Sequence, residues 1–314
     1  MRYYPFSRYL REKYGVRIHR LGLNPGFTCP NRDGTLGTDG CIFCNDEGFS
    51  RFANMDISLE EQIDISMDFA SGRYNAKKFI AYFQTGTGTH NTLTGLKNAY
   101  DVIRKYPDIV GLFISTRPDC VDKDRLDLIE SYSDDYEVWI EYGIQTVHDD
   151  TLTRIGRKHT FSQSRDAILE TSGRNIKTGV HLILGLPGEN EKHMIDTART
   201  ISGLPVSGIK FHALHVLKDT KLEGMYGEGK INLMDFHEYV NIICNILEYI
   251  PKDCIILRLV SDAQNGLLVA PGWMKDKQKI INAVEKKLEE HNTFQGALHE
   301  IPSSAGGDRI KREG

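Results

Sequence analysis

Residues 177–215 read KTGVHLILGLPGENEKHMIDTARTISGLPVSGIKFHALH and contain the clearest pattern in the chain. Residues 177–185 and 208–215 are mostly apolar and have the length of strands, whereas residues 191–202 carry apolar side chains at helical spacing. Two strands joined by a helix through short connections lie parallel in one sheet. Strands that are apolar along most of their length are typical of a sheet covered on both faces. This stretch therefore predicts an α/β fold with a parallel sheet.

The same alternation of strands and helices runs through the preceding part of the chain. Further strands are predicted at residues 16–23, 78–84, 110–115 and 137–145. Helices are predicted at residues 59–71, 93–105, 123–131 and 162–173. All these elements make six β-then-α units, which predict a partial (β/α)6 barrel of the TIM type. In such barrels the carboxyl ends of the strands carry the chemistry.

The remaining residues predict an addition to this barrel rather than a second barrel. We expect residues 1–230 to form the core, with residues 231–302 packed on it as a C-terminal extension. The extension is predicted to contain a helix, a short strand and a second helix at residues 233–250, 255–259 and 277–291. Residues 303–314 are rich in Ser, Gly and charge, which predicts a flexible tail.

Composition narrows the class of protein. The 314 residues have a net charge of −4 and a pI near 6.3, which argues against a general polyanion binder but not against a local basic groove. No segment approaches the roughly 18 continuous apolar residues of a spanning helix, and the N-terminus lacks the apolar core of a secretory signal. The six cysteines are too sparse for a secreted disulfide framework. We therefore expect a cytoplasmic protein without a membrane partner.

Three of these cysteines lie close together, directly after the first predicted strand. Residues 26–44 read GFTCPNRDGTLGTDGCIFC and contain Cys29, Cys41 and Cys44. Thiolates are natural ligands of iron–sulfur clusters, and Gly, Asn and Asp tolerate the backbone angles that a loop around a cluster needs. Three ligands would leave one iron open to a substrate or cosubstrate. The alternatives are a zinc site, with His19 or His90 as fourth ligand, and ordinary buried thiols.

The cysteine segment and the motifs at the strand ends resemble the radical S-adenosylmethionine (SAM) superfamily. The resemblance is to its YhcC/YtqA-like branch, which is related to the catalytic subunit of Elongator, and it covers roughly residues 1–290. It implies that Cys29, Cys41 and Cys44 hold one [4Fe–4S] cluster, in residues 26–45, whose open iron chelates SAM. One electron, from a donor such as flavodoxin or ferredoxin, then breaks the C–S bond and yields methionine and a 5′-deoxyadenosyl radical. No second cysteine group is present for an auxiliary cluster.

The resemblance also assigns residues to SAM at the ends of the later strands. They are Gln84, Thr85, Gly86, Thr87, Ser115, Arg117, Glu141, Gln145 and Gly185. Residues 84–87 occupy the loop that contacts the methionine amino group, and Arg117 is suited to a carboxylate through paired N–H bonds. Gly185 would let the backbone approach adenine closely. Glu141, in an apolar strand, has the alternative of an ion pair with Arg117 or Lys210.

Other polar residues near the predicted strand ends carry weaker expectations. His90 stands where the branch usually has an aromatic residue. His212 and His215 are three apart, so on a strand at most one should face the site. Cys120 is the only spare thiol near that site, and its catalytic use is a further hypothesis.

Three functions compete for the radical. The first is modification of a tRNA base, a wobble uridine or its side chain, with the basic residues Arg154, Arg157 and Lys158 available to phosphates. The second is radical chemistry on a small metabolite or a peptide. The third is a non-catalytic iron–sulfur or zinc-binding module.

Overall fold

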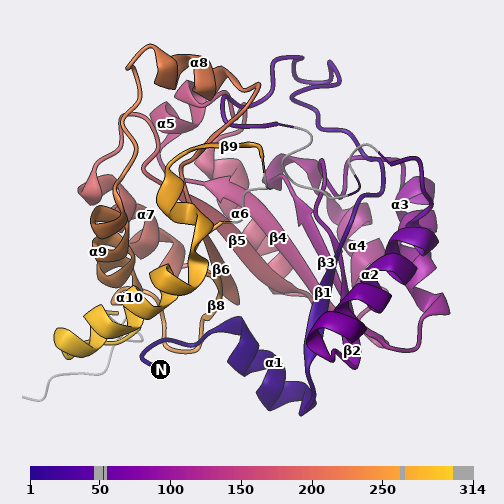
Figure 1. Cartoon of the computed structure of the whole chain (residues 1–314). Coiled ribbons are helices and arrows are strands. Elements are labelled where there is room, and N and C mark those ends of the chain that lie inside the picture. Colours follow the sequence, from indigo (N-terminus) through magenta and orange to yellow (C-terminus); the bar gives the residue numbers. More distant parts are fainter. Residues whose placement is uncertain (46–51, 53–54, 262–265, 300–314) are drawn as a thin grey trace, which may run out of the picture.

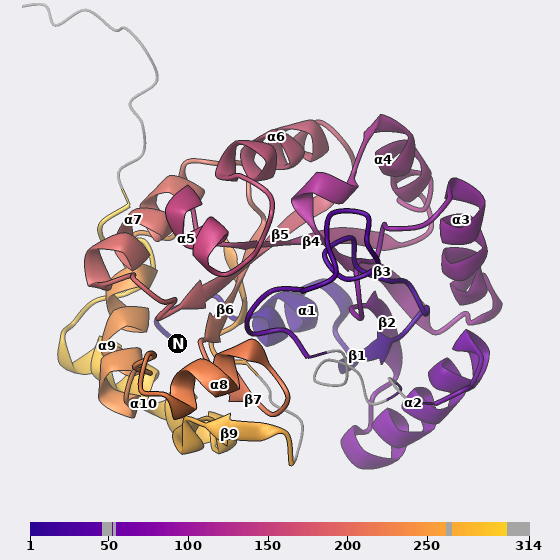
Figure 2. The same cartoon turned by 90° about the horizontal axis from the view of Figure 1, so that it is seen from above.

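A computed structural model describes residues 1–45, 52, 55–261 and 266–299 of the chain. Its main sheet contains seven parallel strands in the order β1-β2-β3-β4-β5-β6-β8. The bounds are β1 Ile18–Leu23, β2 Lys78–Phe83, β3 Ile109–Thr116, β4 Glu137–Gln145, β5 Lys177–Leu184, β6 Gly208–Ala213 and β8 Ile255–Arg258. The sheet curls into a half-barrel with helices around it (Figures 1 and 2), which confirms the predicted partial barrel.

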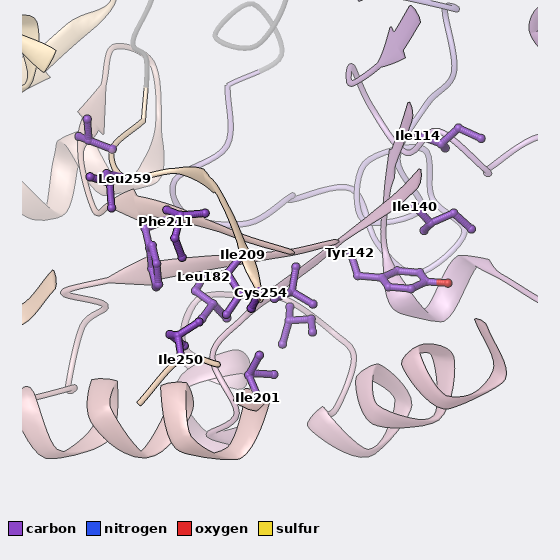
Figure 3. Packing of buried hydrophobic residues seen from close by; sticks show 14 of the residues in the cluster. Ile114, Ile140, Tyr142, Leu182, Ile201, Ile209, Phe211, Ile250, Cys254 and Leu259 are labelled. Atoms are coloured by element: carbon purple, nitrogen blue, oxygen red, sulfur yellow. The ribbon is translucent and has the colours of Figure 1, made fainter. Parts of the chain in front are cut away.

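Helices cover the outer face of this sheet. They are α2 Leu59–Tyr74, α3 Leu93–Asp101, α4 Lys123–Glu130, α6 Phe161–Ser172 and α7 Glu191–Ser202. Each begins after a Ser, Thr, Asp or Asn whose side chain accepts a hydrogen bond from the third backbone N–H of the helix. The helix predicted at residues 93–105 is divided, because its last four residues form a 3₁₀ turn. Figure 3 shows the buried apolar side chains between these helices and the sheet.

A helix that the sequence analysis did not predict closes the amino-terminal end of the half-barrel. This helix, α1 (Phe6–Tyr14), packs against β1 and β8, the two end strands of the sheet, and lies at the far end of the ring of strands in Figure 2. Phe6 lies against Phe113 and Trp139, whose rings stack with centroids 5.4 Å apart inside the barrel. This aromatic layer fills the bottom of the interior, so that space for a ligand lies toward the carboxyl ends of the strands.

The C-terminal part supplies one strand of the sheet and a cover beside it. Strand β8 comes from the predicted extension and pairs with β6. The short helix α5 Asp149–Arg154 follows β4. The elements after β6, apart from β8, are β7 Val216–Leu217, α8 Lys221–Gly227, α9 Phe236–Leu247, β9 Leu268–Ala270 and α10 Lys277–Glu290. Strands β7 and β9 pair antiparallel, and α9 packs between α7 and α10. The tail predicted at residues 303–314 lies outside the described residues. None of the helices in the described part of the chain is long and apolar enough to span a bilayer.

Candidate active site

A cavity of about 750 Å³ occupies the carboxyl end of the half-barrel. Cys29, Cys41 and Cys44 all contribute to its lining, so the structure brings the three predicted ligands to one place. The predicted rim residues that also line it are Gln84, Thr85, Gly86, Thr87, Ser115, Arg117 and Gln145. Its volume is within the range of small-molecule and cofactor sites.

The cysteine segment is held on the barrel by its own polar groups. Asn31, which is only 1 % exposed, donates from Nδ2 to the backbone oxygen of Gly156 at 2.9 Å. The N–H of Ile42 donates to the oxygen of Ile155 at 3.1 Å. The segment is therefore fastened to the turn after α5.

Two N–H donors approach the sulfur of Cys41. Arg157 Nη1 lies 3.7 Å from Cys41 Sγ, and Asn31 Nδ2 lies 3.6 Å from it. Arg157 also donates to the oxygen of Gly143 at 2.7 Å, and its buried Nε has no hydrogen-bond partner among the described residues. A guanidinium and an amide directed at one sulfur suit a thiolate that ligates a metal cluster. Arg157 is thus buried within the cavity, and the prediction that it meets phosphates is wrong.

The predicted zinc alternative finds little support in the geometry. His90 hydrogen-bonds Asp33 at 2.8 Å, and His19 stacks on Tyr74; neither lines the cavity. Within the part of the chain that the structure describes, no three His, Cys, Asp or Glu side chains meet closely enough to hold a single metal ion. A [4Fe–4S] cluster does not need that convergence, because each thiolate binds a different iron atom.

The loop after β2 packs directly on the cysteine segment. Thr87 donates its backbone N–H to the oxygen of Thr28 at 3.1 Å. Gly86 has φ +67°, and a Cβ at this position would lie 2.1 Å from the backbone oxygen of Phe27, so only glycine is accommodated. The hydroxyls of Thr85 and Thr87 are buried and have no partner among the described residues. They are available to a polar ligand in the cavity.

Arg117 is held in place by an acidic neighbour. Its Nε and Nη2 donate to the two carboxylate oxygens of Asp119 at 2.9 and 2.7 Å, and Nη2 also donates to the oxygen of Arg157. The buried Nη1 has no partner in the described part of the chain. The paired N–H bonds predicted for a ligand carboxylate are therefore made to Asp119, and one nitrogen remains for a ligand.

Glu141 lies beneath the cavity and not in its lining. It is fully buried, and its Oε2 accepts hydrogen bonds from Lys210 Nζ at 2.8 Å, His181 Nε2 at 2.6 Å and Tyr82 OH at 2.7 Å. Its Oε1 lies 3.4 Å from Arg20 Nη1. Of the two predicted ion-pair partners the structure selects Lys210. Burial alone would raise the pKa of Glu141, but Lys210, His181 and Arg20 outweigh that effect and hold it well below its usual range.

A row of basic side chains above Glu141 was missed as a functional feature. His181, Lys210 and Arg258 are neighbours in register across β5, β6 and β8, and all three line the cavity. Burial, together with the positive charges of Arg20 and Arg258, lowers the pKa of Lys210 to about 7 despite the opposing effect of Glu141. The sequence did contain a signal for this row, because each of the three otherwise apolar strands carries a charged or imidazole side chain that faces the cavity.

Three remaining predictions have different outcomes. His212 and His215 both line the cavity, so the prediction that at most one faces the site is wrong; β6 ends at Ala213, and strand alternation does not extend to residue 215. Gly185 lines a second cavity of about 510 Å³ beside Met234, apart from the cysteines. Cys120 hydrogen-bonds weakly to Asp119 and does not line the main cavity.

Comparison with known proteins identifies the family. The family model described as "Radical SAM superfamily" matches residues 23–201, and "Radical_SAM C-terminal domain" matches residues 206–290. The chain belongs to the radical SAM superfamily. The uncharacterized protein YtqA of Bacillus subtilis is 35% identical over 296 residues, which are 94% of this chain and 92% of YtqA. This membership makes the protein an enzyme, and the superfamily implies a [4Fe–4S] cluster and SAM.

Two further similarities are to a tRNA uridine(34) acetyltransferase and to the solved structure of an archaeal Elp3. The tRNA uridine(34) acetyltransferase of Dehalococcoides mccartyi is 27% identical over 156 residues, which are 49% of this chain and 33% of that protein. The solved structure of the archaeal Methanocaldococcus infernus Elp3 superposes with a TM-score of 0.62 at 16% identity, covering 88% of this chain and 64% of that one. This second likeness shows that the two proteins share a fold.

Proposed function

We propose that Cys29, Cys41 and Cys44 each ligate one iron of the [4Fe–4S] cluster and leave the fourth iron to SAM. The observation that carries this assignment is that all three cysteines line one cavity, with Arg157 and Asn31 donating to the Cys41 sulfur. When bound, the cluster supplies the electron that cleaves SAM into methionine and a 5′-deoxyadenosyl radical. The N–H donors stabilise negative charge on the sulfur ligand.

The rim residues are proposed to orient SAM. Residues 84–87 adjoin the cysteine segment and offer two hydroxyls without a partner among the described residues, which suits the methionine amino group. Arg117 contributes the N–H at Nη1, and Ser115 and Gln145 line the same cavity. Gly185 lies in the neighbouring cavity, so an adenine contact there requires the ligand to extend beyond the main cavity. A flavodoxin or ferredoxin is the proposed electron donor.

We further propose that the substrate is a tRNA wobble uridine or its side chain. The support is similarity over 156 residues to a tRNA uridine(34) acetyltransferase. Arg154 and Lys158 are exposed in the segment that holds the cysteine loop, where a phosphate could reach them. A wobble base is unstacked and can enter a pocket.

Two experiments test the proposal in sequence. Anaerobically reconstituted protein, reduced in the presence of SAM, should release 5′-deoxyadenosine, and each single Cys→Ser change at the three ligands should abolish the release. Mass-spectrometric nucleoside profiling of tRNA from a deletion strain should then show one modified uridine lost and its precursor accumulated. An unchanged profile in a strain that lacks the active enzyme would reject the tRNA substrate in favour of a small metabolite or a peptide.

A further inference from the structure

Arg157 is a buried cation whose hydrogen bonds go to no carboxylate of the described residues. The residue is 8 % exposed, and its guanidinium donates to the sulfur of Cys41 at 3.7 Å and to the backbone oxygen of Gly143 at 2.7 Å. Its Nε is buried without a partner among the described residues. Arginine is rarely buried unless a negative charge compensates it, and the anionic group nearest to this guanidinium is the sulfur of a cluster ligand.

The surrounding backbone fixes the position of this guanidinium. Gly156 adopts φ +71°, and the backbone oxygens of residues 156 and 157 both accept from Asn31 Nδ2, at 2.9 and 3.3 Å. On the barrel side, a Cβ on Gly143 would lie 2.7 Å from Arg157 Nη2, so the absence of a side chain there leaves room for the guanidinium. Arg157 is therefore held between the end of β4 and the cysteine segment.

Two other arginines near the cysteines are placed differently. Arg117 donates to both carboxylate oxygens of Asp119, so its charge is offset locally. Arg32 donates to the backbone oxygen of Cys44 at 3.4 Å and is partly exposed, so solvent screens its charge. Arg157 is buried and has no carboxylate of this kind beside it. Its charge consequently acts on the cysteine segment with little screening.

We infer that Arg157 is the counter-charge of the iron–sulfur cluster and makes the cluster easier to reduce. This inference rests on the proposed ligation by three cysteines and adds a control of the electron-transfer step. A [4Fe–4S] core with three thiolates is negatively charged, and the electron delivered by flavodoxin or ferredoxin adds a further negative charge. A fixed cation beside one thiolate stabilises the more negative state more strongly, so it favours the reduced cluster.

The test is a redox titration of the reconstituted enzyme without SAM, followed by electron paramagnetic resonance of the reduced cluster. Arg157→Gln retains an N–H donor but removes the charge. At one fixed potential, its ratio of reduced to oxidised cluster should be about tenfold to a hundredfold lower, as expected for one charge at the effective dielectric of a protein interior. Arg157→Lys keeps the charge and should stay within about threefold of wild type. Arg165→Gln, on the exposed side of α6, is the matched control and should leave the ratio unchanged.

A second measurement separates electron supply from a structural role. In Arg157→Gln, the release of 5′-deoxyadenosine with flavodoxin as donor should fall by a larger factor than the release with titanium(III) citrate. The stronger reductant compensates for a cluster that is harder to reduce. A purely structural defect would lower both rates by the same factor and would reject the inference.

The remaining outcomes are also decisive. An unchanged ratio in Arg157→Gln overturns the inference, because the charge then does not act on the cluster. An equally low ratio in Arg157→Lys overturns it as well, because the effect is then not one of charge. Loss of the cluster from both variants would make Arg157 a structural residue. Failure of the wild-type chain to bind iron would instead reject the proposed cluster ligation, and the inference with it.

Discussion

Replacing Glu141 by Gln tests a buried carboxylate that accepts hydrogen bonds from four side chains. The substitution keeps the shape of the side chain and removes the charge that Lys210 and Arg20 face. Removing one partner of a buried ion pair costs about 3–5 kcal/mol, because the other charge is left without compensation. Unfolding entropy of about 2.1 cal/mol/K per residue over 314 residues converts this cost into a Tm decrease of ~5–8 °C.

The stability lost on replacing Glu141 by Gln should also depend on pH. Lys210 has its pKa lowered to about 7, so it is charged at pH 6 and largely neutral at pH 9. The pair with Glu141 is therefore worth more at pH 6, and the loss of Tm on substitution should be larger there than at pH 9. Differential scanning fluorimetry of the reconstituted enzyme at both pH values measures the two losses.

Two further variants make the result interpretable. Glu60→Gln breaks the exposed pair with Lys105 and should change stability by less than about 1 kcal/mol. Glu141→Gln combined with Lys210→Met should be less destabilised than the sum of the single changes, because both charges are removed together. A Glu141→Gln enzyme as stable as Glu60→Gln, or strict additivity in the double variant, would refute the buried ion pair.

Two other predictions address the cluster and the loop beside it. Cys29→Ser should strongly lower the iron bound by reconstituted protein. Cys120→Ser should leave both the iron content and the product formation unchanged. An effect of Cys120→Ser on product formation would restore that thiol as a catalytic candidate. Gly86→Ala should disturb the cysteine segment, because its Cβ would meet the oxygen of Phe27 at 2.1 Å, and a normal SAM affinity in this variant would contradict the packing of the two loops.

The parallel barrel was predictable because its signal is local and repeated. Every strand of the six units is a short apolar run, and every helix between them has its own capping residue, such as Ser58 for α2 or Thr160 for α6. Helix α1 was missed because it has no side-chain cap at Pro5 and packs on β8, about 240 residues away. Strand β8 was found, but nothing local in its four residues shows that it pairs with β6.

The site was predictable at the rim and not at the floor. The cysteines and residues 84–87 form contiguous motifs, so a sequence pattern can represent them. The row of His181, Lys210 and Arg258 takes one residue from each of three strands, so it forms only in the observed register. Lys210 becomes a neighbour of His181 and Arg258 only when β5, β6 and β8 are paired. Likewise, only the path of the turn after α5 shows that Arg157 enters the cavity, although Arg154 and Lys158 beside it remain exposed.

The rim and the floor of the cavity are built in different ways. The cysteines and residues 84–87 lie after the strands, and Gly86 there adopts a positive φ angle in direct contact with the cysteine segment. Glu141, His181 and Lys210, by contrast, are regular strand residues whose side chains hydrogen-bond one another inside the barrel. A change at Lys210 therefore acts on strands that hold the barrel together, whereas a change at Gly86 acts on the packing of the cysteine segment.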